Sequence, residues 1–218
     1  MMDGAKVTGS AIFALAFGQG LLAPRISRAA KIPFPESDCG IGKEGNKRIL
    51  IAYASRFGTT GGVAERIGRV FCEKGQTADV RHIKNMGDIE SYDAAVIGSA
   101  VRSSKWLPEA VQFVQENRKT LSRMPVAYFL TCLATAQKTP DARSTAQSYM
   151  DSALQEVPEV KPVDTGLFAG VLDYGKMNFI MRAVMKSKMK DKGVAEGDYR
   201  DWNGIRSWAE NVAPKLLA

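Results

Sequence analysis

The chain has 218 residues, of which 45% are hydrophobic and 24% are charged. These proportions are average for globular proteins and exclude a chain that is disordered throughout, while the length suits one well-cored domain with some extra. The net charge is +7, and residues 1–46 hold five basic and four acidic residues, so the rest of the chain carries +6. A basic domain favours anionic partners such as nucleic acid, acidic lipid or small carboxylates.

The N-terminal residues 1–46 differ in composition from the rest. Residues 7–24 are mostly Ala, Leu, Phe and Gly with basic residues on either side, which is typical of a signal peptide or a short membrane anchor. Residues 31–46 hold two prolines and three glycines and predict a linker. We therefore expect an N-terminal segment, residues 1–46, before a folded domain, residues 47–218. Membrane association or export is expected; a plain tail on a cytoplasmic protein is the alternative.

From residue 48 onward, predicted strands and helices alternate. Strands are predicted at residues 49–54, 78–83, 93–99, 125–132 and 166–172, and helices at residues 62–73, 107–118, 141–157, 177–190 and 202–217. Short apolar strands separated by helices predict a parallel sheet covered on both faces, which makes a doubly wound α/β fold. A ligand of such a fold binds outside the carboxyl ends of the strands.

The loop after the first predicted strand, residues 55–62, reads Ser-Arg-Phe-Gly-Thr-Thr-Gly-Gly and leads directly into a helix. Three hydroxyls, several backbone amides and a helix N-terminus meet there, and this combination favours an anion. The loop lacks the lysine of a nucleoside-triphosphate loop, so a single terminal phosphate is the expected ligand. The alternative is a loop in which Thr59 or Thr60 merely caps the helix.

Residues 53–67, Tyr-Ala-Ser-Arg-Phe-Gly-Thr-Thr-Gly-Gly-Val-Ala-Glu-Arg-Ile, resemble the flavodoxin signature, with Ala52 as one departure. The resemblance implies a flavodoxin-like doubly wound sandwich, a five-stranded parallel sheet of order 2-1-3-4-5 and FMN as the cofactor. Residues 97–102, residues 168–172, the basic helix after them, and Asp201, Trp202 and Trp208 resemble the protoporphyrinogen dehydrogenases of this fold. Those enzymes depend on FMN and are coupled to menaquinone.

The resemblance implies three FMN-binding segments and no metal. The phosphate would lie on Ser55, Arg56, Phe57, Gly58, Thr59 and Thr60, and the flavin ring between Ser99, Ala100, Val101, Arg102 and Ser103 on one side and Thr131, Cys132, Leu133, Ala134 and Thr135 on the other. Neither ring segment contains an aromatic residue, and Trp106 follows just beyond the first. We expect an open flavin face, which suits direct reaction with an organic substrate.

No protein acid or base is identified by a motif; Asp173, Tyr174 and Arg102 are the candidates. The single histidine, His82, excludes any mechanism that needs two, and a structural role is expected for it. The three cysteines form no close pair, so neither a disulfide framework nor a zinc site is predicted. Cys72 and Cys132 lie in apolar stretches and are expected in the core.

Residues 176–192 carry methionines on one helical side and mainly Arg182, Lys186 and Lys190 on the other. An ordinary surface helix would pack this apolar stripe on the sheet. The alternative is contact with an anionic membrane surface or with the propionates of a porphyrin. Arg56 and Arg102 could guide the same anionic substrate. No recognition helix, zinc finger or aromatic RNA platform is present, so no nucleic-acid partner is expected.

The sequence therefore predicts an FMN-dependent oxidoreductase resembling menaquinone-linked protoporphyrinogen dehydrogenase, which passes electrons from a reduced, anionic, porphyrinogen-like substrate to a quinone. A flavodoxin-type electron carrier without substrate turnover is the first alternative, although such carriers are typically acidic. A fold that has lost its flavin, and a reductase fed by a nicotinamide cofactor, are two others. If the N-terminal segment is an export signal, haem synthesis fits less well, because it would need a cytoplasmic active site.

Overall fold

A computed structural model of the chain describes residues 32–40, 47–137 and 139–218. Its centre is a sheet with five parallel strands in the order β3-β2-β4-β6-β7, which confirms the predicted 2-1-3-4-5 order. These strands are β2 (Arg48–Ala54), β3 (Thr77–His82), β4 (Ala94–Arg102), β6 (Val126–Cys132) and β7 (Asp164–Ala169). The predicted count of five strands is not confirmed: within the described residues the sheet has seven, because β1 (Ser37–Cys39) pairs antiparallel with β3, and β5 (Lys105–Trp106) pairs antiparallel with β4.

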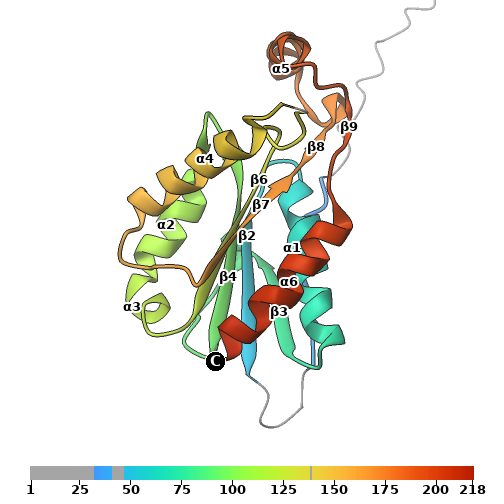
Figure 1. Cartoon of the computed structure of the whole chain (residues 1–218). Helices are drawn as coiled ribbons and strands as arrows, with labels where there is room; N and C mark the ends of the chain where they lie inside the picture. The colour runs from blue at the N-terminus through green and yellow to red at the C-terminus, as the bar shows by residue number, and fades with distance from the viewer. Residues whose placement is uncertain (1–31, 41–46, 138) are drawn as a thin grey trace, which may run out of the picture.

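Helices cover both faces of the sheet (Figure 1). One face carries α1 (Thr59–Glu73) and α6 (Trp202–Leu217), and the other carries α2 (Pro108–Glu116), α3 (Arg118–Leu121) and α4 (Ala142–Glu156). Two short 3-10 turns, η1 (Ile83–Asn85) and η2 (Tyr174–Lys176), follow β3 and the short strand β8 (Val171–Leu172). Nowhere in the described ranges is there a helix with the length and apolar character needed to cross a bilayer.

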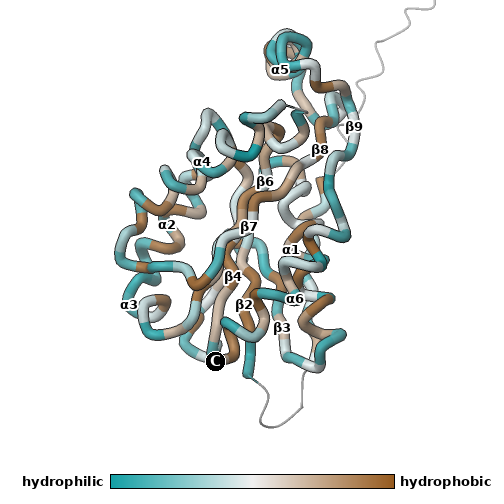
Figure 2. The backbone as a smooth tube through the Cα atoms, viewed as in Figure 1, coloured by the Kyte–Doolittle hydropathy of each residue, from teal (hydrophilic) through white to brown (hydrophobic). Residues whose placement is uncertain are grey.

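The apolar run of β2 shows how the strands create two cores. Successive side chains of a strand point to opposite faces. Leu50 and Ala52 therefore pack into the cluster beneath α2 and α4, whereas Ile49, Ile51 and Tyr53 pack into the cluster beneath α1 and α6. All five are fully buried, and Figure 2 shows apolar residues concentrated along the central strands. A strand buried on both faces needs a continuous apolar run, which is why the sequence predicted it.

Two predicted elements are divided in the structure. The helix predicted at residues 107–118 becomes α2 and α3, which meet at Asn117, whose side-chain amide donates to the Phe113 carbonyl. The strand predicted at residues 166–172 is wrong as one strand, because β7 ends at Ala169 and β8 pairs with β9 (Gly197–Asp198) in a separate ladder. Both halves are apolar, so hydrophobicity alone could not show that the chain changes sheets.

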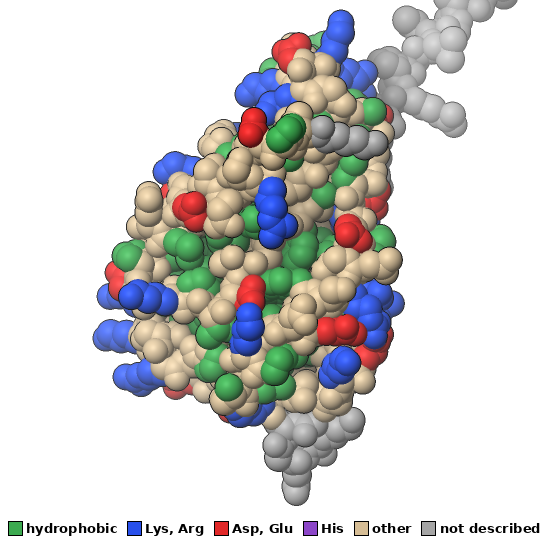
Figure 3. Space-filling model, viewed as in Figure 1, with side chains coloured by type: hydrophobic (Ala, Val, Ile, Leu, Met, Phe, Trp, Pro, Cys, Tyr) green, Lys and Arg blue, Asp and Glu red, His purple; other side chains and the backbone are tan. Residues whose placement is uncertain are grey.

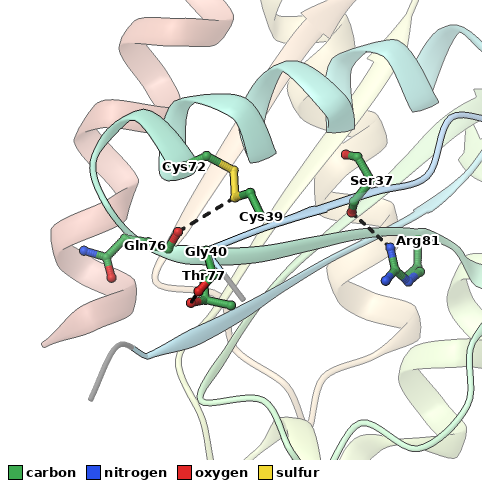
Figure 4. The surroundings of a disulfide bond; sticks show 7 residues. All are labelled: Ser37, Cys39, Gly40, Cys72, Gln76, Thr77 and Arg81. Atoms are coloured by element: carbon green, nitrogen blue, oxygen red, sulfur yellow. Dashed lines mark hydrogen bonds between the residues drawn. A yellow bond between two sulfur atoms is a disulfide. The ribbon is translucent and has the colours of Figure 1, made fainter. Parts of the chain in front are cut away.

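Residues 32–40, expected in a linker, instead belong to the domain through β1. Cys39 of β1 and Cys72 of α1 form a disulfide with a Cα–Cα distance of 6.0 Å (Figure 4). The prediction that no cysteines pair is therefore wrong, because the antiparallel β1 brings together two residues 33 positions apart. Cys132 is the free, buried cysteine. The predicted anchor or signal and the rest of the predicted linker, residues 1–31 and 41–46, lie outside the described residues.

Candidate functional site

Residues 55–62 lie at the carboxyl edge of the sheet, where residues 55–58 connect β2 to α1 and residues 59–62 form the start of α1, so this helix begins three residues before the predicted position. Gly58 has a φ of 80° and is the N-cap of α1, and no side chain caps the first turn of this helix. The first turn also contains no acidic residue. The simple capping role considered for Thr59 or Thr60 is therefore wrong. Uncapped amides at a helix N-terminus, together with the helix dipole, provide donors for an anion.

The hydroxyls of this loop divide into two kinds. Thr60 is fully buried, and its Oγ1 lies 2.8 Å from the Oγ1 of Thr131 at the end of β6. The hydroxyls of Ser55 and Thr59 form no hydrogen bond within the described residues. Two free hydroxyls beside uncapped amides form a neutral set of donors, and such a set fits a phosphate monoester. Thr60 instead connects the loop, through its hydrogen bond with Thr131, to the predicted ring segment of residues 131–135.

The N-terminal residues 33–35 lie against the same loop. The Tyr53 hydroxyl donates to the Pro35 carbonyl at 2.9 Å. A Cβ on Gly58 would collide with the Pro33 carbonyl oxygen, and one on Gly61 would lie 2.7 Å from Pro35 Cδ. Glycine at these two positions therefore lets the N-terminal residues approach the loop closely, and Gly58 also needs its left-handed backbone.

The first predicted ring segment, residues 99–103, is part of a β-hairpin formed by β4 and β5. Its turn residues Ser103 and Ser104 have φ values of 51° and 66°, the left-handed conformation that a two-residue hairpin turn requires. Ser99 is buried, and its hydroxyl accepts from the Leu107 amide and donates to the Ala100 carbonyl. Arg102 is exposed and has no partner among the residues that the structure describes. The hairpin therefore offers backbone and Arg102 to a ligand.

The second predicted ring segment begins at the end of β6, directly beside this hairpin. Thr131 is paired with Ala100 in the parallel register. Thr131, Cys132 and Ala134 are buried, whereas Leu133 is partly exposed. The three predicted FMN segments are thus brought together at one edge of the sheet. Which of their residues contact a flavin stays a prediction.

Trp106, the aromatic residue nearest to the predicted ring segments, is a core residue. It is 3% exposed and packs edge-on against Tyr128, with ring centroids 5.1 Å apart. Within the described chain its indole nitrogen has no hydrogen-bond partner. Trp106 is part of the hairpin through β5, but its buried ring offers no exposed surface for stacking.

Residues 171–200 form a small lobe at the carboxyl edge of the sheet, and α5 (Phe179–Asp191) is its main element (Figure 1). Of the two interpretations of this helix, the one in which it packs its apolar stripe on a face of the sheet is wrong. Its methionines instead pack on an apolar cluster that joins the lobe to two of the predicted FMN segments; the members are Leu172, Met177, Met189, Val194, Phe57, Leu133, Ala136, Tyr174, Met181, Met185 and Tyr199. The lobe is therefore attached to the candidate site.

The outer side of α5 is both apolar and basic. Phe179 is 85% exposed and Ile180 73% exposed, and Val184 is also exposed. The same helix carries Arg182, Lys186, Lys188 and Lys190, and Figure 3 shows several Lys and Arg side chains, with acidic ones among them, at this tip of the molecule. Contiguous exposed apolar side chains with flanking cations are typical of a surface that meets a partner.

The catalytic candidates Asp173 and Tyr174 lie in this lobe. The Asp173 carboxylate accepts from the Gly175 amide at 2.8 Å and lies 3.8 Å from the Lys176 ammonium. The Tyr174 ring lies beneath the Lys186 ammonium, 5.4 Å from it. These contacts stabilise the lobe, and a catalytic role for either residue stays a prediction.

Lys176 lies next to residues 55–62, which we call the phosphate-type loop. No pattern in the sequence assigned this lysine to the loop. Its Nζ lies 3.5 Å from the carbonyl oxygen of Phe57, which is 119 residues away in the chain. No pattern in the sequence connects two residues at such a separation. Only the folding of the lobe over the loop places a cation there.

His82 and Tyr53 are uncharged neighbours of the loop. His82 is 5% exposed, and its ring packs against Phe34 and Tyr53 at centroid distances of 4.8 and 5.2 Å. Burial lowers the pKa of His82 and raises that of Tyr53. Both are neutral at pH 7, so the positive charge near the loop comes from Arg56, Lys176 and Arg200, whose Nη1 would lie 2.6 Å from a Cβ on Gly62. The structural role expected for His82 agrees with this packing.

A separate cavity of about 590 Å³ lies along the edge of β7, between α4 and α6. Figure 3 shows hydrophobic side chains gathered in this hollow. Phe168 and Trp208 line it together with Arg143 and Asp201. Of the predicted FMN-binding residues, only Thr135 borders it, so this cavity is distinct from the phosphate-type loop.

Comparisons with known proteins agree with this architecture. A family model described as "Flavodoxin domain" matches residues 50–197. A curated protein of Leishmania major, named protoporphyrinogen IX dehydrogenase [quinone], is 28% identical over 179 residues, which cover 78% of this chain and 77% of that protein.

Two solved structures are also similar. Oxidised flavodoxin 2 from Bacillus cereus is 19% identical, with a TM-score of 0.46, over 77% of this chain and 99% of that one. A flavoprotein in complex with FMN from Lactobacillus acidophilus is 15% identical, with a TM-score of 0.42, over 56% of this chain and 93% of that one.

Proposed function

This chain belongs to the flavodoxin domain family, and we propose that it binds FMN at the carboxyl edge of its sheet and acts as an FMN-dependent oxidoreductase. The observation that carries the proposal is the loop of residues 55–62. Its uncapped amides, and the hydroxyls of Ser55 and Thr59, which have no hydrogen-bond partner among the described residues, suit the terminal phosphate of FMN. A buried hydroxyl pair, Thr60 and Thr131, holds this loop against the segment expected beside the flavin ring.

FMN, when bound, supplies the transfer of hydride and electrons, and the protein supplies binding and orientation. Ser55 and Thr59 would donate hydrogen bonds to the phosphate, and the positive N-terminal end of the α1 dipole would stabilise its negative charge. The β4–β5 hairpin and residues 131–134 would hold the ring. Arg56 and Arg102 are exposed cations without partners in the described residues, and they would attract an anionic substrate to this edge.

The finer proposal is a reaction like that named for the Leishmania major relative, with a porphyrinogen-like substrate and a quinone acceptor. The net charge of +7 supports an anionic substrate and counts against a simple electron carrier. The quinone would be met at a membrane surface. Phe179, Ile180 and Val184 would enter the lipid interface while neighbouring lysines face anionic headgroups.

The Cys39–Cys72 disulfide supports a proposal of export, because disulfides persist in oxidising compartments. An exported domain would be separated from cytoplasmic haem synthesis. Membrane-linked flavin redox chemistry with an anionic organic substrate is therefore the form of the proposal that best fits the disulfide.

The first experiment records the visible spectrum of the purified chain and titrates the flavin-stripped protein with FMN. Oxidised-flavin absorption bands and tight binding of FMN support the proposal. A colourless protein that ignores added FMN would overturn it.

A second experiment separates the enzyme from the carrier. The FMN-loaded protein is mixed anaerobically with protoporphyrinogen and a menaquinone analogue, and turnover of both is followed. Continuous turnover supports an oxidoreductase. Reversible reduction without consumption of any organic substrate would favour the carrier.

The membrane contact is tested by sedimentation with vesicles. We expect binding to vesicles that contain anionic phosphatidylglycerol and weaker binding to neutral phosphatidylcholine vesicles. The double substitution Phe179→Ser and Ile180→Ser should reduce binding, whereas Val163→Ser, a change of an exposed apolar residue outside the lobe, should not. Equal binding of all three proteins would contradict a contact through α5.

A further inference from the structure

Lys176 belongs to the lobe, and its ammonium reaches the loop of residues 55–62. It ends η2, and its side chain is 31% exposed. Its ammonium contacts the Phe57 carbonyl oxygen at 3.5 Å and the Asp173 carboxylate at 3.8 Å. Both contacts are long for a lysine, so neither holds the ammonium strongly.

The position of the Phe57 carbonyl relates this ammonium to the anion site. Phe57 directly precedes Gly58, the N-cap of α1, so the ammonium lies about one peptide unit from the uncapped first turn. A lysine side chain has a flexible stem and compact charge that can move over this distance. The loop itself contributes one cation, Arg56, which is exposed.

The lobe also brings other groups to this place. Gly170, just before β8, lies close enough to Thr59 that a Cβ on it would sit 3.6 Å from Thr59 Cγ2. Phe57 packs in the apolar cluster of the lobe. The lobe thus fixes the backbone around Lys176 while leaving its ammonium weakly engaged.

We infer that Lys176 is a phosphate-recognition residue. Its ammonium would give up its contacts with Phe57 and Asp173, pair with the terminal phosphate of FMN and so favour the binding of FMN over that of riboflavin. This inference rests on the proposed function. The amides and hydroxyls of the loop would bind the phosphate as neutral donors, and Lys176 would add a charge-assisted hydrogen bond from the lobe. Because the side chain is partly exposed, solvent screening limits its effect to about tenfold in Kd.

The test compares two ligands that differ only in the phosphate. Flavin-stripped full-length protein is titrated with FMN and with riboflavin, and flavin fluorescence reports each Kd at low salt. Lys176→Met should raise the Kd for FMN about tenfold and leave that for riboflavin within about twofold. Lys176→Arg, which keeps the charge, should retain most of the FMN affinity. Lys119→Met, a change of an exposed lysine on α3, should change neither Kd.

Equal weakening of FMN and riboflavin would overturn the inference, because Lys176 would then act through packing. Unchanged FMN affinity in Lys176→Met would overturn it as well. These outcomes leave the proposed function standing. Failure of the unsubstituted protein to bind FMN would overturn both.

Discussion

Breaking the disulfide between Cys39 and Cys72 should destabilise the domain strongly. The bond joins residues 33 positions apart. In the chain-entropy model, closing a loop of this length stabilises the folded state by about 3.7 kcal/mol at 25 °C. For a chain of this size, about 1 kcal/mol corresponds to roughly 2–4 °C in Tm, so reduction should lower the Tm by about 7–15 °C.

The assay first establishes the bond and then removes it. Under denaturing conditions, iodoacetamide should label Cys132 alone before reduction and all three cysteines after it. Thermal unfolding is then followed by circular dichroism with and without dithiothreitol. The double substitution Cys39→Ser and Cys72→Ser should unfold like the reduced protein, and dithiothreitol should not shift its Tm further.

Two results would refute this reasoning. Labelling of all three cysteines before reduction would show that the bond does not form. An unchanged Tm after verified reduction would show that residues 32–40 stay in place without the disulfide. The pairing of β1 with β3 and the hydrogen bond from Tyr53 to Pro35 would then be sufficient to hold them.

Three further substitutions test the core and the site. Gly98→Ala should destabilise the domain by about 1–3 kcal/mol in urea denaturation, because a Cβ there would enter the Phe129 ring; an unchanged denaturation midpoint would contradict this packing. Thr131→Val should cost about 1–3 kcal/mol by leaving the buried Thr60 hydroxyl without a partner, and the double change of both to Val should cost less than the sum of the single changes. Burial lowers the pKa of His82, so the unfolded chain takes up its proton more readily below about pH 6.5, and stability falls as the pH falls. His82→Asn should flatten that decline, and equal slopes would exclude His82 as its source.

The site was partly predictable. Residues 55–62 stood out because a hydroxyl-rich loop between an apolar strand and a helix is a local pattern, and local patterns set the turn and the helix start. The neighbouring segments 99–103 and 131–135 were assigned by resemblance, and the register of Ala100 beside Thr131 shows that they are adjacent. Lys176 was not assigned to the loop, since its approach to Phe57, 119 positions away in the chain, depends on the path of all the residues between them.

By itself, the sequence determined the five parallel strands, their order through the family signature, and the loop that follows β2. The strands and the loop rest on short-range patterns, because a strand buried on both faces requires consecutive apolar residues, whereas the order rests on the resemblance to flavodoxins. The tertiary structure alone decided the Cys39–Cys72 bond, the division of the last apolar run between β7 and β8, and the projection of α5 from the carboxyl edge. These depend on which distant segments pack together. Composition and spacing can show that a residue is apolar or basic, but only the packed chain shows what it faces.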